Sequence, residues 1–98
     1  MITIEKKTHD SLAEWKLQGW LDTGSTPVLA DALAELPEDT ERLILDFAGV
    51  EYISSAGLRQ IVAAHKQVGG NLTLRHLNNE ILNVIRMTGL DRRLHIEE

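Results

Sequence analysis

The sequence predicts one α/β domain over residues 1–98, with a mixed, mostly parallel β-sheet, about three main helices and the order β-β-α-β-α-β-α-β. Three observations lead to this fold class. Two alternating segments open the chain, helix-period segments then alternate with short apolar runs, and no linker or repeat divides the 98 residues. The βαβ units require right-handed crossovers and parallel strands, whereas the opening pair is joined by a turn short enough for antiparallel pairing.

The first two strands are expected within residues 1–7 and 12–21, joined by a turn at residues 9–11. Side chains of the second segment alternate between two faces. Trp15 shares the apolar parity with its leucine neighbours, while Trp20 falls on the polar parity. We therefore expect Trp20 to point outward, although packing beneath a helix is an alternative.

A first helix is expected after Asp22. Residues 23–27 read Thr-Gly-Ser-Thr-Pro, which offers hydroxyl N-caps and a proline suited to the first helical turn. Pro37 should stop this helix. Its apolar side chains at helical spacing are Val28, Leu29, Ala32, Leu33 and Leu36.

The third strand, residues 42–47, is a short apolar run typical of a buried strand. Residues 49–57 should form the loop that follows, and Ser54 or Ser55 should cap a second helix that ends at residues 69–70. The side chains of this helix that share one face are Leu58, Ile61, Val62, His65 and Val68.

The last third of the chain repeats this pattern. Residues 72–75 alternate as a strand, and Asn78 or Asn79 can cap a third helix that ends near Gly89. Residues 94–96 are expected to add a final strand. The apolar positions of the third helix are Ile81, Leu82, Val84 and Ile85.

Composition excludes several classes of protein. The absence of cysteine excludes a disulfide framework, a thiolate zinc site and a cysteine nucleophile. Ten Lys and Arg against fifteen Asp and Glu leave a net charge of −5, which opposes binding to nucleic acid or anionic lipid and favours a basic partner. Short apolar runs indicate neither a signal peptide nor a membrane span, so a cytoplasmic protein is expected.

An enzyme is the least favoured class. His65 lies ten residues beyond Ser55 on the same predicted helix, about 15 Å away, which is too far for a serine–histidine pair. Asp22 and Asp46 are a possible magnesium pair, but a simpler role for Asp46 is to bond loop N–H groups. We assign no catalytic residue, metal or cofactor, and no role to His9, His65, His76 or His95.

A family resemblance adds to this interpretation. The segment LILDFAGVEYISSAGL at residues 43–58 resembles the STAS domain of anti-sigma-factor antagonists. GWLD at residues 19–22, with its Thr/Ser/Pro helix start, and MTGL at residues 87–90 are also similar to that family and occur in the same order. The resemblance covers essentially the whole chain and implies a single STAS domain.

The resemblance implies a phosphorylation site. In these antagonists the helix start usually reads Asp-Ser-Ser/Thr-Gly, and the first serine after the acid is phosphorylated; that position is Ser55 here. Ser54 replaces the usual acid and Ala56 replaces the usual Ser or Thr. Asp22 matches an acid usually placed beside the phosphoserine loop, and either Asp22 or Asp46 is a candidate to compensate for the missing carboxylate.

The resemblance also implies partners. The unphosphorylated domain would bind an anti-sigma factor or serine kinase, ATP and magnesium would belong to that kinase, and a phosphatase would reverse the modification. The domain itself is expected to be a monomer or weak homodimer. The expected partner-binding residues are Trp20, Asp22, Thr23, Ser54, Ser55, Ala56, Gly57 and Arg59.

Simpler roles exist for several of these residues. Both serines are suitable as ordinary helix caps, and Arg59 as a solvated surface arginine. A second STAS function is also open, that of an unphosphorylated adaptor beside the ATPase of an ABC-type lipid-transport complex.

Overall fold

The computed structural model describes residues 2–97 and confirms the predicted fold class. Five strands form one sheet in the order β1-β2-β3-β4-β5; β1 and β2 pair antiparallel, and every later neighbour pairs parallel. Met1, part of the predicted first strand, lies outside the described residues. The elements are β1 Ile2–His9, β2 Leu12–Leu21, α1 Thr26–Ala34, β3 Arg42–Ile53, α2 Ser55–Gln67, β4 Leu72–Arg75, α3 Asn79–Thr88, a 3₁₀ turn Leu90–Arg92 and β5 His95–Glu97.

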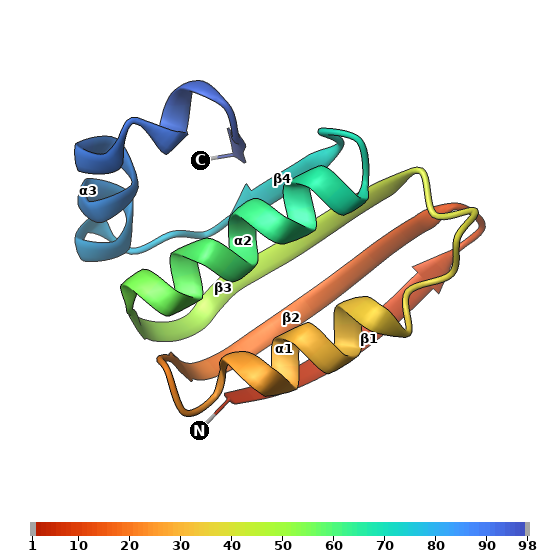
Figure 1. The fold of residues 1–98 in the computed structure, drawn as a ribbon, viewed down its shortest axis with the longest axis horizontal. Helices are drawn as coiled ribbons and strands as arrows, with labels where there is room; N and C mark the ends of the chain where they lie inside the picture. Colours follow the sequence, from red (N-terminus) through yellow and green to blue (C-terminus); the bar gives the residue numbers. More distant parts are fainter. Residues whose placement is uncertain (1, 98) are drawn as a thin grey trace.

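The helices cover one face of the sheet because the strands follow one another in sequence order. With right-handed crossovers, each βαβ unit then places its helix on the same side. Figure 1 shows α1 and α2 side by side across this face, with α3 at the end of the molecule where α2 begins. The largest fully buried side chains are Phe47, Leu17, Leu21, Leu29, Leu43, Leu45, Ile61, Leu72, Leu74, Ile81 and Ile85.

The opposite face of the sheet carries a row of alternating charges. Strand register places Glu5, Lys16, Asp46, Arg75 and Glu97 next to one another, one from each strand. Opposite charges on directly paired residues stabilise a sheet, and charged side chains keep an uncovered face compatible with water. This row explains how the sheet tolerates helices on only one side.

Arg75 is the most connected member of the row. Its guanidinium lies 2.9 Å from the Glu97 carboxylate and 2.8 Å from that of Glu14. These partners, Glu97 first, raise the pKa of Arg75 above its usual value. The arginine therefore links β2, β4 and β5 across the open face.

The structure corrects one predicted boundary that matters for the site. Residues 49–57 do not form a loop, because β3 continues to Ile53 and only Ser54 separates it from α2. Val50 and Ile53 are buried and keep the strand in the sheet, and two register shifts against β2 accommodate the extra length. A smaller correction is that α1 ends at Ala34, before Pro37.

Gly57 is required where α2 meets β2. A Cβ atom at this position would lie 2.6 Å from the Leu21 carbonyl oxygen and 2.9 Å from Ile53 Cγ1. The backbone oxygen cannot move away as a flexible side chain would. The start of α2 can therefore approach β2 only with glycine here.

We expect Gly57→Ala to lower the free energy of unfolding by about 1–3 kcal/mol, because overpacking outweighs the better helix propensity of alanine. Gly24→Ala is the matched control, since its Cβ would meet only Asp22 Oδ1 at 3.7 Å and should change stability by less than about 0.5 kcal/mol. Urea unfolding measures both variants. Equal stability of the two proteins would contradict the tight contact.

Candidate functional site

Ser54 and Ser55 have different surroundings although they are neighbours. Ser54 is the N-cap of α2, and its hydroxyl accepts the Gly57 N–H at 3.2 Å. Its own N–H donates to the Leu21 carbonyl at 3.0 Å. Ser54 is therefore held in place by the fold, and its hydroxyl caps α2.

Ser55 is the first residue of α2, and its side chain is exposed. Among residues 2–97, no hydrogen bond engages its hydroxyl, and the Ser55 and Ala56 N–H groups donate to no acceptor. Free N–H groups at a helix start, together with the helix dipole, favour a negative group such as phosphate. The hydroxyl is thus accessible, and a phosphate attached to it is locally compatible with the fold.

Asp22 is adjacent to this serine segment because Leu21 and Ile53 are paired in the sheet, and Asp22 and Ser54 come next on their strands. Its carboxylate, however, serves its own loop. It accepts the Ser25 N–H at 3.0 Å and lies 2.8 Å from the Ser25 hydroxyl. The Ser25 hydroxyl is the main cause that lowers the pKa of Asp22.

Ser25 is a site residue to which the sequence assigned no role of its own, beyond its place in the helix start at residues 23–27. It is buried, it caps α1 without a side-chain bond to the helix, and its hydroxyl lies close to the Trp20 carbonyl and accepts the Asp22 N–H. Its role could have been predicted from the spacing of Asp22 and Ser25, since an acid three residues before a serine is common in tight polar turns. Ser25 therefore holds Trp20 and Asp22 in fixed positions.

Trp20 points outward with 52% of its surface exposed, as strand parity predicts. Its ring lies 6.1 Å from that of Tyr52, which is 50% exposed, and its indole N–H donates to Glu51 at 3.0 Å. Tyr52 and Glu51 were not among the predicted site residues; their contacts with Trp20 depend on the pairing of β3 with β2. Exposed aromatic pairs of this kind are suited to protein contacts.

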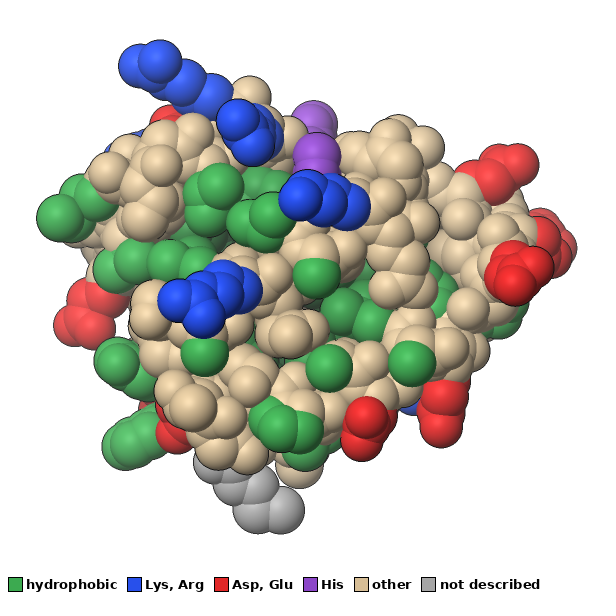
Figure 2. Space-filling model, in the orientation of Figure 1, with side chains coloured by type: hydrophobic (Ala, Val, Ile, Leu, Met, Phe, Trp, Pro, Cys, Tyr) green, Lys and Arg blue, Asp and Glu red, His purple; other side chains and the backbone are tan. Residues whose placement is uncertain are grey.

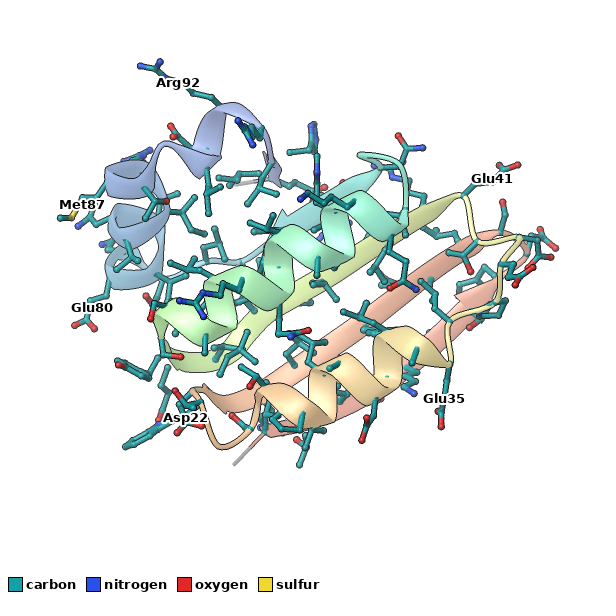
Figure 3. All side chains as sticks on the ribbon, in the orientation of Figure 1. Asp22, Glu35, Glu41, Glu80, Met87 and Arg92 are labelled. Carbon is teal, nitrogen blue, oxygen red and sulfur yellow. The ribbon has the colours of Figure 1, made fainter. Side chains whose placement is uncertain are left out.

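The other predicted contact residues lie at the same end of the molecule. Thr23 and Arg59 are exposed, and Ala56 is half-buried. Figure 3 labels Asp22, Glu80 and Met87 at this end, and Figure 2 shows hydrophobic side chains gathered along its rim. We call this surface, formed by Trp20, Asp22, Thr23, Tyr52, Ser54, Ser55, Ala56 and Arg59, the serine face. Gly57, also among the predicted contact residues, is buried.

Asp46 does not belong to the serine face, so it cannot compensate for the missing carboxylate. It pairs with Lys16, five residues before the end of β2, which places it roughly 17 Å along the sheet from Leu21, where the serine face begins. It points to the open face, where it accepts the Ala48 N–H at 2.9 Å, as expected of it, and lies 2.9 Å from His76 Nδ1. Burial raises the pKa of Asp46, but these bonds and the nearby Lys16 outweigh it, so the pKa is lowered.

The proposed magnesium pair of Asp22 and Asp46 is thus not brought together. In residues 2–97 no group of three or more His, Asp or Glu side chains is arranged to hold a metal ion. The same residues contain no helix both long and apolar enough to cross a membrane. His76 does make a specific contact, with Asp46, that the sequence interpretation did not assign.

Comparisons with known proteins agree with the geometry. A family model described as "Mlab, STAS domain" matches residues 6–97. The chain is 30% identical to the anti-sigma-B factor antagonist of Bacillus subtilis over 92 residues, covering 91% of this chain and 84% of that protein. It is 32% identical to the anti-sigma-B factor antagonist of Staphylococcus epidermidis over 101 residues, covering 99% and 94%.

A solved structure of an anti-sigma factor antagonist from Mycobacterium paratuberculosis superposes with a TM-score of 0.87 at 24% identity, covering 98% of this chain and 85% of that one. At this identity the superposition shows a shared fold. The two sequence relatives extend the similarity to named regulatory antagonists.

We expect Ser25→Ala to move the pKa of Asp22 back towards its ordinary value, because the Ser25 hydroxyl is the main group that lowers it. A lowered pKa means that ionised Asp22 stabilises the fold above pH 3.8 and that this stabilisation disappears as pH falls through the folded value. The variant should therefore lose less stability on acidification. NMR titration of the Asp22 carboxyl carbon and urea unfolding across this pH range measure both effects.

Ser55→Ala is the control, since its hydroxyl makes no bond to Asp22. It should leave the titration of Asp22 unchanged. An unchanged titration in Ser25→Ala would instead show that the loop hydrogen bonds do not govern this carboxylate.

Proposed function

The chain belongs to the STAS domain family, and from this premise we propose that it is an anti-sigma-factor antagonist controlled by phosphorylation of Ser55. Unphosphorylated, it binds an anti-sigma factor or related serine kinase through the serine face and so frees a sigma factor or another client. The kinase supplies ATP and magnesium, and a phosphatase restores the binding form. We place this exchange in the cytoplasm, with the domain acting as a monomer or weak homodimer.

The observation that carries the proposal is the division of roles between two adjacent serines. Ser54 is occupied as the helix cap, whereas Ser55 is exposed, and within residues 2–97 its hydroxyl is free and lies next to unpaired N–H groups. A kinase can reach Ser55 without unfolding the helix start. The family relationship supports the same residue, because Ser55 occupies the phosphoserine position of the motif.

Phosphorylation would act on binding and leave the fold intact. The phosphate adds about −1.5 to −2 charges to a domain with a net charge of −5. It also places three oxygens on a surface that the partner must approach closely. Displacing one close contact or leaving a charge unpaired at the interface weakens binding by about 2–5 kcal/mol, which is about 30-fold to several-thousand-fold.

The aromatic pair beside the serines gives the partner an apolar anchor. Trp20 and Tyr52 pack against each other and stay half exposed, and Ser25 and Glu51 hold Trp20 through its carbonyl and its indole N–H. A fixed aromatic side chain loses little conformational freedom on binding. Phosphate at Ser55 would therefore act at the edge of a prearranged contact surface.

Ser54 in place of the family's acid favours a second candidate function. A STAS adaptor that stays unphosphorylated does not need an acid for kinase recognition, and such an adaptor would dock on the ATPase of an ABC-type lipid-transport complex. The partner recovered from the native host distinguishes the two functions. A serine kinase supports the switch, and a transport ATPase supports the adaptor.

With its cognate serine kinase, ATP and magnesium, we expect the protein to gain one phosphate, mapped by mass spectrometry to Ser55. Ser55→Ala should bind the kinase constitutively, and Ser55→Asp should bind at least about tenfold more weakly while remaining folded, because a carboxylate suits a helix N-terminus. Calorimetry measures binding, and thermal melting verifies the fold.

Ser54 provides the matched control. Ser54→Ala should lower stability by about 1 kcal/mol through loss of the cap but keep phosphorylation at Ser55. Ser54→Asp should restore the family's acid and leave the phosphorylated residue unchanged. Phosphate found only on Ser54, or equal binding by Ser55→Ala and Ser55→Asp, would contradict the switch.

We expect Trp20→Ala to weaken binding of the same kinase about 30-fold, with little change in melting temperature, because the side chain is half exposed. Trp20→Phe keeps an aromatic ring beside Tyr52 but loses the bond to Glu51, so it should lie between wild type and Trp20→Ala. Titration and thermal melting of both variants test this. A large fall in melting temperature with unchanged affinity would move the interface elsewhere.

A further inference from the structure

The open face of the sheet contains a hollow of about 500 Å³ that the proposed function does not use. It lies on the side of the sheet opposite α1 and α2, so it is separate from the helix-covered core. Its polar lining comes from β1, β2, β3 and the segment after β4, namely Thr3, Glu5, Lys16, Gln18, Asp46 and His76.

The hollow exists because β3 has small residues beside it. Ala48 and Gly49 line its wall, next to Gln18, which pairs with Gly49. A Cβ atom at Gly49 would lie 2.9 Å from Gln18 Cγ. A larger residue at position 49 would displace Gln18.

Asp46 presents a free carboxylate oxygen to this hollow. Asp46 is only 8% exposed. Its hydrogen bonds with the Ala48 N–H and with His76 both use Oδ1. Among residues 2–97 no buried side-chain oxygen lacks a partner, so Oδ2, which has no protein partner, keeps contact with solvent. The lining of the hollow thus includes an ionised oxygen held in a fixed direction.

The Ala48 N–H and His76 together orient the Asp46 carboxylate. An ionised carboxylate only accepts hydrogen bonds, so the His76 Nδ1 atom, 2.9 Å away, carries the proton. The residue has a φ of 59°, a left-handed conformation uncommon for residues other than glycine. The chain therefore adopts an unusual local geometry at the residue that makes this contact.

Lys16 supplies the opposite charge beside Asp46. The two residues are paired in register, and no carboxylate in residues 2–97 lies within 4.0 Å of the Lys16 ammonium. Glu5 flanks Lys16 on β1. The lining therefore carries two carboxylates, Glu5 and Asp46, and one ammonium, Lys16, so a ligand that has both a cationic and an anionic group can use both kinds of charge.

We propose that this hollow binds a small zwitterion, a free α-amino acid, with its ammonium group on Asp46 Oδ2 and its carboxylate on Lys16. Neighbouring strands are about 4.8 Å apart, so residues paired across them present opposite charges at a separation that one small molecule can span. Gln18 and Thr3 add hydrogen-bonding groups at the rim. The volume leaves room for a side chain on the ligand.

The test is an NMR titration of the ¹⁵N-labelled full chain with glycine and L-alanine, with acetate and methylammonium as separate halves of the ligand. We expect saturable shifts at Lys16, Gln18, Ala48 and Gly49 with both amino acids, and weaker binding of either half. Binding by acetate or methylammonium as tight as by the amino acids would overturn the proposal, as would the absence of saturable shifts with both amino acids.

Two variants localise the effect. Lys16→Gln should weaken binding at least about tenfold by removing one charge-assisted contact, and Gly49→Ala should weaken it by displacing Gln18. Lys7→Gln, an exposed lysine on β1 outside the hollow, is the matched control and should bind as wild type. Circular dichroism verifies the fold of each. Equal affinity of Lys16→Gln and Lys7→Gln would place the ligand elsewhere.

Discussion

The backbone of Leu21 is the point on which the serine face depends. Its carbonyl accepts the Ser54 N–H and lies so close to α2 that only glycine fits at position 57. The last residue of β2 thereby sets both the end of β3 and the start of α2. Ser55 is exposed at a fixed place because Ser54 and Gly57 are held on either side of it.

The mostly parallel sheet explains why the serine face and the core are separated in this chain. Helices on one face bury the apolar side chains, and the other face is left to a row of paired charges. Carboxyl ends of parallel strands gather at one edge, where residues from β2 and β3 meet although they are distant in sequence. The serine face and the polar hollow therefore occupy different parts of the same two strands.

Periodicity and capping residues predicted most of the fold because they are local signals. The alternation around Trp15 and the caps at Ser54 and Asn78 depend on residues within a few positions of each other, and the structure contains them. The outward direction of Trp20 follows from the same alternation. Local patterns predicted an element correctly wherever its buried side chains follow the repeat of a helix or a strand.

The features that the sequence did not predict depend on contacts between residues far apart in the chain. Residues 49–53 follow the apolar run that ends at Phe47 and were predicted as part of a loop, yet pairing with β2 keeps them in a strand. The contact between Asp46 and His76 joins residues thirty positions apart, which no spacing rule reveals. Consequently Tyr52 in the serine face, its neighbour Glu51 and the hollow on the open face could be identified only from the register of β3.

The two register shifts between β2 and β3 connect these missed features. One gives β3 an extra residue between the Lys16–Asp46 and Gln18–Gly49 pairs, and the Asp46 carboxylate accepts the Ala48 N–H there. The other leaves Glu51 without a partner in the ladder, and its side chain accepts the Trp20 indole N–H. At each shift an acidic side chain satisfies a donor beside the irregularity. The same bulges that lengthen β3 thus shape the hollow and, further along the strand, orient the exposed tryptophan.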